Sequence, residues 1–226
     1  MNELVFLESM KLDEEPYTTS LVIAEFAKIE HRAVRQLIRK YKDDLDNFGK
    51  TTFYMSKITK GRGRKSRIYR LNEQQATLII TYLDNTEPVR KFKQQLVHQF
   101  YYMKEELIRR QVQREQGKAT RISLTDAIQQ SGISEKYYFH YTNLAYKTSL
   151  GYSAKQLRAA RGVKNNSSPL DYLTTEELQA INQREQQIAT LIMLGMDYEQ
   201  IKAVLVNGGV LYQITLSKTT NKLQEA

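Results

Sequence analysis

The spacing of apolar residues predicts a mostly helical chain that contains one short β-hairpin. From Val89 to Leu107 the apolar positions recur at intervals of three and four, the period of an α-helix packed on one side. A second series, Val97, Tyr101 and Ile108, lies on another face of the same helix. We therefore expect this helix to contact both its own domain and a second subunit, so that the protein is a homo-oligomer.

Two shorter helices are predicted nearer the N-terminus, one from Ser20 to about Ala27 and one from about Glu30 to Tyr41. Ala24 is small enough for the second helix to pass closely over the first, and Val34 begins an inward-facing apolar set that continues with Leu37 and Ile38. This pattern is typical of a helix-turn-helix. The alternative is an ordinary helical hairpin with a solvated basic face. The side chains predicted to face outward and bind DNA are His31, Arg32, Arg35, Gln36 and Arg39.

A β-hairpin with a basic tip is predicted directly after this helical pair. Residues 51–55 and 67–71 are rich in strand-forming residues, and Gly61 and Gly63 between them allow a tight turn. Residues 57–70 contain seven basic residues and no acidic one. Such a hairpin is typical of the wing of a winged-helix domain, although a solvated loop is the alternative. Its predicted DNA-binding residues are Lys57, Lys60, Arg62, Arg64, Lys65 and Arg67.

Beyond the long helix the chain is predicted to form a second, all-helical domain. Residues 111–120 are polar and include Gly117, so they are predicted to be a linker between residues 1–110 and 121–206. In the second domain Ser123 starts a helix, and Thr174 with Glu177 forms a capping box at the start of another. Residues 207–226 are expected to form a strand-like piece and a polar tail. The fold class is therefore α+β and mostly helical, with a winged-helix-like N-terminal domain and an all-α C-terminal domain.

The charge of the chain is concentrated in the predicted helical pair and hairpin. The 226 residues include 34 Lys and Arg against 25 Asp and Glu, a net charge of +9. From Lys28 to Arg70 there are 14 basic and 4 acidic residues, and 14 − 4 gives +10, more than the whole chain carries. A local positive charge of this size attracts polyanions in a salt-dependent way. Since the chain has no cysteine and no apolar run of membrane-spanning length, a cytoplasmic protein without membrane contact is expected.

Candidate catalytic and metal-binding groups are sparse. The three histidines, at 31, 98 and 140, are far apart in the sequence and lack the spacing of metal ligands. The acidic residues at 43, 44 and 46 are typical of a solvated turn, and the Gly-Arg segment lacks the spacing of a phosphate-binding loop. We therefore expect no enzymatic activity, no metal and no cofactor.

The N-terminal motifs resemble those of the Rha family of phage regulatory proteins. The similarity spans about residues 17–110 and rests on residues 23–28, His31, Val34 and Ile38, on the Gly-Arg hairpin with residues 69–71, and on Phe100 and Met103 before residues 104–107. The resemblance implies a phage or prophage transcriptional regulator that binds double-stranded DNA and is associated with the nucleoid of a bacterial host. Residues 121–205 more loosely resemble C-terminal modules of phage antirepressors, through residues 141–144 and 173–178.

Two functions therefore remain open from the sequence. One is a DNA-binding regulator, and the other is an antirepressor that binds a phage repressor protein; nonspecific RNA binding is a third, weaker alternative. Helical spacing predicts that Tyr137, Tyr141 and Leu144 are core residues of the second domain. Tyr138 and His140 would then be free to stack on a partner protein.

Overall fold

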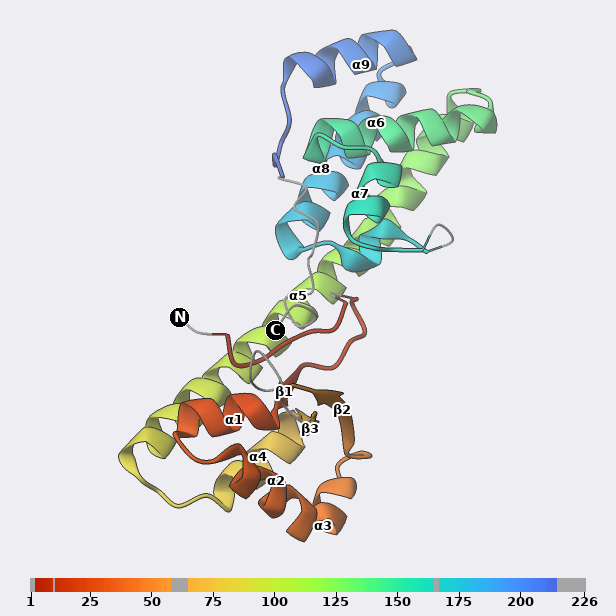
Figure 1. Cartoon of the computed structure of the whole chain (residues 1–226). Helices are drawn as coiled ribbons and strands as arrows, with labels where there is room; N and C mark the ends of the chain where they lie inside the picture. Colours follow the sequence, from red (N-terminus) through yellow and green to blue (C-terminus); the bar gives the residue numbers. More distant parts are fainter. Residues whose placement is uncertain (1–2, 10, 58–64, 165–166, 215–226) are drawn as a thin grey trace. The chain divides into compact units, whose positions relative to one another are not determined.

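The computed structural model describes residues 3–9, 11–57, 65–164 and 167–214 (Figure 1). They form two compact units that divide between Glu105 and Glu106, apart from residues 11 and 12, which cluster with the second unit. This boundary lies within the long helix that the sequence assigns to the first domain. None of the described helices is both long and apolar enough to cross a membrane. The architecture is α+β and mostly helical, as the sequence predicts.

The first unit contains a three-stranded antiparallel sheet in the order β1-β3-β2, made by β1 (Tyr17–Thr19), β2 (Thr52–Ser56) and β3 (Ser66–Asn72). The register pairs Thr18 with Leu71 and Phe53 with Tyr69. Leu71 and Tyr69 are buried in the core, so this face of the sheet packs against the helices. Before β1, Phe6 forms a single antiparallel bridge with Tyr17.

Five helices surround or extend from this sheet: α1 (Ser20–Ala27), α2 (His31–Lys40), α3 (Lys42–Asp46), α4 (Glu73–Thr81) and α5 (Glu87–Gln130). Thr19 caps α1, since its Oγ1 accepts a hydrogen bond from the backbone N–H of Val22 at 3.2 Å. The α3 segment was predicted to be a turn. It is helical because Asp43 and Asp44 in its first turn favour a helix N-terminus and Leu45 is fully buried.

Helix α5 continues through residues 111–120, which the sequence analysis predicted to be a linker. The segment is rich in Gln, Arg, Glu and Lys, and these residues have high intrinsic helix propensities. Gly117 allows a close approach instead of breaking the helix. A Cβ atom at this position would lie 2.5 Å from Oδ1 of Asn182, and the side-chain amide of Asn182 donates to the carbonyl of Gln113 at 2.9 Å.

In the second unit all the secondary-structure elements of the described residues are helices. After α5 come η1 (Glu135–Tyr137), α6 (Tyr138–Leu150), α7 (Ala154–Ala160), η2 (Pro169–Tyr172), α8 (Thr175–Met193) and α9 (Tyr198–Asn207). The predicted capping box of Thr174 and Glu177 is confirmed. The strand-like piece expected after Gly209 is not formed by the described residues up to 214.

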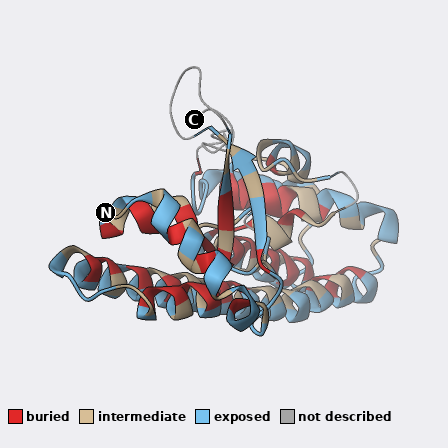
Figure 2. Ribbon diagram, turned by 60° about the horizontal axis from the view of Figure 1, so that its bottom comes forward, coloured by how far each residue is buried: buried red, intermediate tan, exposed pale blue. Residues whose placement is uncertain are grey.

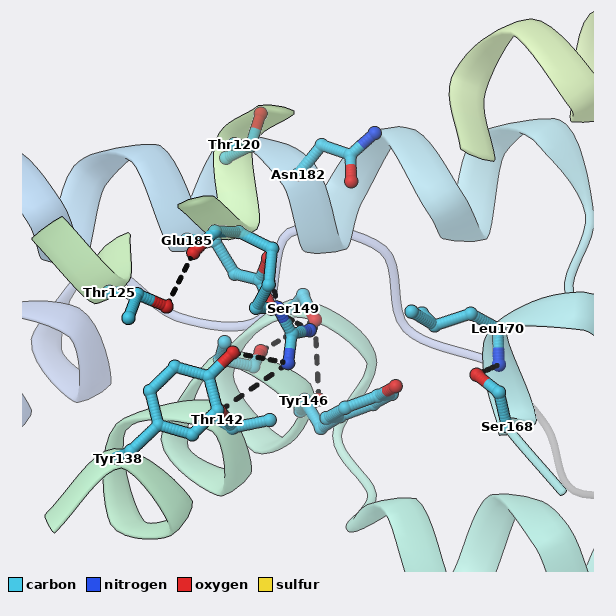
Figure 3. A network of polar contacts seen from close by, with 12 residues as sticks. Thr120, Thr125, Tyr138, Thr142, Tyr146, Ser149, Ser168, Leu170, Asn182 and Glu185 are labelled. Atoms are coloured by element: carbon cyan, nitrogen blue, oxygen red, sulfur yellow. Dashed lines mark hydrogen bonds and ion pairs between the residues drawn. The ribbon is translucent and has the colours of Figure 1, made fainter. Parts of the chain in front are cut away.

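A buried ion pair lies inside this second unit. Glu185 of α8 is 1% exposed and accepts a hydrogen bond from Nε of Arg121 on α5 at 3.0 Å. A terminal nitrogen of Arg121 also lies 3.3 Å from the hydroxyl of Tyr138 and 3.5 Å from that of Thr142, both on α6 (Figure 3). Burial raises the pKa of Tyr146, beside this network, to about 12. The network therefore links three helices through buried polar groups.

Candidate nucleic-acid interface

The turn between α1 and α2 is made by a non-glycine residue in the left-handed conformation. Lys28 has φ 55° and ψ 46°, and the N–H of Ile29 donates to the carbonyl of Ala24 at 3.0 Å. This arrangement ends α1 and redirects the chain into α2. Ala24 is buried, in agreement with the prediction of a small residue in the helical pair.

Helix α2 has one buried and one basic face. Val34 and Ile38 are fully buried in the core of the first unit, and Leu37 packs against that core. The exposed positions include Arg32, Gln36, Arg39 and Lys40. These side chains follow the helical period, so anchoring the apolar face determines which direction the basic face points.

His31 and Arg35, two further predicted contact residues, are only half exposed. Nε2 of His31 is hydrogen-bonded to Oγ of Ser20 at 2.9 Å, and this oxygen also accepts from the backbone N–H of Tyr69 at 3.0 Å. Burial, and then the positive charge of Arg35, lower the pKa of His31. His31 therefore links α2 through α1 to strand β3, a fixed role that the sequence pattern did not indicate.

The described part of the hairpin adds basic and apolar side chains to the same unit. Lys57, directly after β2, and Lys65, directly before β3, are both exposed. The guanidinium of Arg67 lies 4.8 Å from the ring centre of Phe53. Three predicted contact residues, Lys60, Arg62 and Arg64, lie outside the described residues.

Exposed apolar side chains on the hairpin were not identified from the sequence. Phe53 and Met55 are 48% and 49% exposed. Phe53 pairs with Tyr69 and Met55 with Arg67, and paired residues lie on the same face of a sheet. Phe53 and Met55 therefore lie on the face on which Tyr69 is buried in the core. Because the hairpin extends past the core, their side chains are left in solvent. The alternation of side chains along β2 indicates that Phe53 and Met55 lie on one face of the sheet. Only the tertiary structure shows that the core does not cover them.

Arg70 belongs to a different environment. Its guanidinium lies 5.0 Å from the ring centre of Tyr17 and 5.5 Å from that of Tyr54, and it forms an ion pair with Glu8 at 3.0 Å. These three partners hold Arg70 against the sheet. It therefore contributes to the charge of the basic segment while being held by contacts within the unit.

The two predicted partner-binding residues of the second unit differ in exposure. Tyr138 is half-buried and its hydroxyl is bonded to Arg121, so this ring packs inward. His140 is exposed, with its ring centre 5.8 Å from that of Tyr137 and 6.1 Å from those of Phe139 and Tyr198. The prediction that Tyr137 is a core residue is wrong, since it is 43% exposed. It lies in η1 instead of α6, and the α-helical period does not extend to it.

Among the described residues, no group of three or more His, Cys, Asp and Glu side chains is placed to hold a metal ion. The carboxylate of Asp46 accepts hydrogen bonds from the N–H of Thr51 at 2.8 Å and from its hydroxyl at 2.6 Å, and it pairs with Lys42. These contacts hold the pKa of Asp46 far below its usual value. The carboxylate therefore closes the loop between α3 and β2.

A comparison with protein-family models finds a match in the N-terminal part of the chain. Residues 18–105 match the family model of the phage regulatory protein Rha, which covers less than half of the chain. The matched region includes the helical pair and the sheet, and it ends where the first unit ends. No curated protein matches the chain. The N-terminal part of the chain is thus similar to phage regulatory proteins.

Proposed function

We propose that this protein is a phage transcriptional regulator whose first unit binds double-stranded DNA as a winged helix. The observation that carries the proposal is the basic face of α2, where Arg32, Gln36 and Arg39 are exposed opposite the buried Val34 and Ile38. A helix anchored in this way presents its polar face as a rigid surface. The similarity of residues 18–105 to phage regulatory proteins supports the same role.

The order of the elements supports the winged-helix assignment. A strand, a helical pair and a hairpin follow one another, and the hairpin strand β3 lies between β1 and β2. In this arrangement the second helix of the pair enters the major groove of DNA, and the hairpin contacts the DNA phosphate backbone beside that groove. The hydrogen bonds of Ser20 to His31 and Tyr69 fix α2 relative to β3, so that helix and wing bind as one surface.

Each exposed side chain has a chemically defined role in this proposal. Arginine forms bidentate hydrogen bonds with guanine and glutamine with adenine, so Arg32, Gln36 and Arg39 suit the reading of base edges. Lysines bind phosphates as point charges, which suits Lys57 and Lys65 at the ends of the described hairpin strands. Arg67, whose guanidinium lies against the ring of Phe53, suits a contact with the DNA phosphate backbone.

Electrophoretic mobility across a salt series tests this proposal. The wild-type chain should bind DNA from its own regulatory region, and the logarithm of its binding constant should fall linearly with the logarithm of the salt concentration. The variants Arg32→Ala/Arg39→Ala and Lys65→Ala/Arg67→Ala should bind more weakly. Each lost phosphate contact should reduce the salt slope by about one.

A charge-matched control separates a specific surface from net charge. The variant Lys155→Ala/Lys164→Ala removes two exposed positive charges from the second unit and should bind DNA as the wild type does. Wild-type binding that is absent or insensitive to salt would contradict the DNA-binding proposal. If Lys155→Ala/Lys164→Ala weakened DNA binding as much as the variants of α2 and the hairpin do, the attraction would depend on net charge and not on a specific surface.

A second candidate function is binding of a phage repressor by the second unit. The observation that favours it is the exposed aromatic group around His140, in which Phe139 is 70% exposed and Tyr137 is 43% exposed. Exposed aromatic rings of this kind are enriched at the centres of protein interfaces. The protein would then act as an antirepressor, and the two functions can coexist because they use different units.

Calorimetric titration of the full chain with the purified phage repressor tests this second function. Phe139→Ser should weaken the complex at least tenfold, whereas Met193→Ser should leave it unchanged, since Met193 is equally exposed on α8. Binding that survives Phe139→Ser, or no binding by the wild type, would contradict this candidate.

A further inference from the structure

The first strand of the hairpin carries two exposed apolar side chains within a basic segment. Strand β2 is exposed or half-exposed along its length, whereas β3 has three buried residues (Figure 2). Phe53 and Met55 of β2 are 48% and 49% exposed. Residues 50–57 and 65–70 contain five basic residues and no acidic one. The charged side chains of these two segments are therefore all positive.

The core of the first unit determines which way this apolar pair points. Side chains two residues apart on a strand lie on the same face of the sheet, about 6.8 Å from one another. Tyr69, which pairs with Phe53, is buried in the same core as Val34 of α2, and the ring centres of Phe53 and Tyr69 are 5.8 Å apart. Phe53 and Met55 therefore project from the side of the sheet on which α2 packs.

Arg67 connects the apolar pair to the basic surface. It pairs with Met55 across the sheet, and its guanidinium lies 4.8 Å from the ring centre of Phe53. A guanidinium stacked in this way keeps its planar set of N–H donors, which suits bidentate binding of phosphate oxygens. The three side chains thus place two apolar groups and one phosphate-binding group on a single face of the hairpin.

A nucleic acid fits this combination better than a second copy of the chain does. A twofold contact between two such faces would bring Lys65 and Arg67 of one copy towards those of the other, and like charges repel. DNA is complementary to both kinds of group, because its phosphates are anionic and the steps between its stacked bases accept apolar side chains. Base steps are about 3.4 Å apart, so the spacing of about 6.8 Å between Phe53 and Met55 corresponds to two of them.

We propose that Phe53 and Met55 insert between base pairs from the minor groove of the bound DNA and bend the duplex. Apolar side chains that enter DNA in this way unstack base steps and kink the duplex by about 20° to 90°. Pyrimidine–purine steps unstack most easily, so the inserted pair selects a site that contains such a step. This insertion rests on the DNA-binding function proposed above, and it adds a contact that depends on the deformability of the DNA instead of its charge.

Energy transfer between dyes at the two ends of a duplex measures the bend. DNA from the regulatory region should be bent by about 20° or more in its complex with the wild type. Phe53→Ser/Met55→Ser should bind about tenfold more weakly and leave the duplex nearly straight, with the salt slope of the wild type, since no phosphate contact is lost. Phe53→Leu/Met55→Leu keeps two apolar side chains and should retain the bend. A straight duplex in the wild-type complex would overturn the insertion.

A matched control replaces two apolar side chains elsewhere in the first unit. Tyr101 and Tyr102 of α5 are each 60% exposed, and Tyr101→Ser/Tyr102→Ser should bind and bend DNA as the wild type does. Salt-dependent binding and bending that survive Phe53→Ser/Met55→Ser would overturn the insertion alone. Absence of salt-dependent binding by the wild type would contradict the DNA-binding function as well.

A fluorescent adenine analogue that brightens on unstacking locates the insertion in the DNA. The wild type should brighten it at a pyrimidine–purine step, and Phe53→Ser/Met55→Ser should not. Replacing that step by a stiff A-tract should weaken binding of the wild type about tenfold and leave binding of the serine variant unchanged. Equal weakening of both proteins would show that another part of the chain reads this step, and it would overturn the insertion.

Sedimentation without DNA tests a second copy of the chain as the competing occupant. The insertion predicts that the wild type and Phe53→Ser/Met55→Ser sediment alike, with the same circular dichroism, because the replaced side chains are exposed. A wild type that sediments as a dimer, together with a serine variant that sediments as a monomer, would assign these side chains to a contact between copies and overturn the insertion.

Discussion

At the scale of single residues, backbone conformation and burial decide which of the side chains predicted to contact DNA are exposed to solvent. Lys28 bears the conformation that ends α1, and His31 is held by Ser20, although both stand in a segment that the sequence marks only as basic. Arg32, Gln36 and Arg39 remain exposed on α2. The basic face could be predicted from helical period alone. The fixation of His31 could not, because its partner is eleven residues away on another helix.

The left-handed conformation of Lys28 has a measurable cost. A side chain with a Cβ atom is disfavoured by about 1 kcal/mol at φ 55°, whereas glycine adopts this conformation readily. Lys28→Gly should therefore raise the free energy of unfolding by about 1 kcal/mol in urea titrations. Lys28→Ala keeps the Cβ atom and should give no such gain, so equal effects of the two substitutions would contradict this explanation.

Acid should destabilise the first unit through His31. Since the pKa of His31 is lowered in the folded state, its contribution is fully present above the unfolded value of about 6.5 and is lost as pH falls through the folded pKa. The free energy of unfolding should therefore decrease as pH falls below about 6.5. His31→Gln should flatten this dependence, and His98→Gln, at an exposed position of α5, should not. Parallel pH profiles for both variants would rule out this role.

At the scale of elements, local sequence predicted most helices and the capping box of α8, but it placed several boundaries wrongly. Ser123 lies inside α5 instead of starting a helix, and the expected linker is part of the same helix. The polar residues around Gly117 have the composition of a linker, and they are also good helix formers. The choice is made by α8, whose Asn182 packs where a Cβ atom at position 117 would lie. A glycine that allows close packing and a glycine that breaks a helix are indistinguishable in the sequence.

A double-mutant cycle measures this packing. Gly117→Ala gains helix propensity of about 1 kcal/mol, but it displaces Asn182 and loses the hydrogen bond to Gln113, which offsets a similar amount. The substitution should therefore be nearly neutral in the wild type and stabilise the Asn182→Ala variant by about 1 kcal/mol. Urea unfolding of the four chains gives the coupling energy, and identical effects in both backgrounds would exclude the proposed contact.

At the scale of the whole molecule, the chain forms two units with separate cores and different polar chemistry. The basic surface belongs to the first unit, whereas the second is organised around the buried pair of Arg121 and Glu185. A charge count along the sequence predicted the first of these features. It did not predict the second, because Glu185 interrupts an apolar stripe of α8 and its partner is 64 residues away.

The buried pair should stabilise the second unit without affecting DNA binding. Arg121→Met leaves Glu185 buried without its partner and should lower the free energy of unfolding by about 3 kcal/mol, whereas Arg121→Met/Glu185→Leu should lose less. Both variants should bind DNA with the salt slope of the wild type below their unfolding temperature. Thermal unfolding followed by circular dichroism and mobility shifts check the two parts. A changed salt slope would show that the second unit contributes to DNA binding.

The sequence by itself determined the helical pair, the hairpin, the capping box of α8 and the concentration of positive charge, since these depend on local period, turn residues and residue type. The tertiary structure alone decided that His31 is fixed and Phe53 exposed, that α5 passes through the expected linker, and that Tyr138 turns inward while Tyr137 does not. Each of these outcomes depends on residues distant in sequence, which fill or leave open the space around a side chain. Local patterning contains no information about that space.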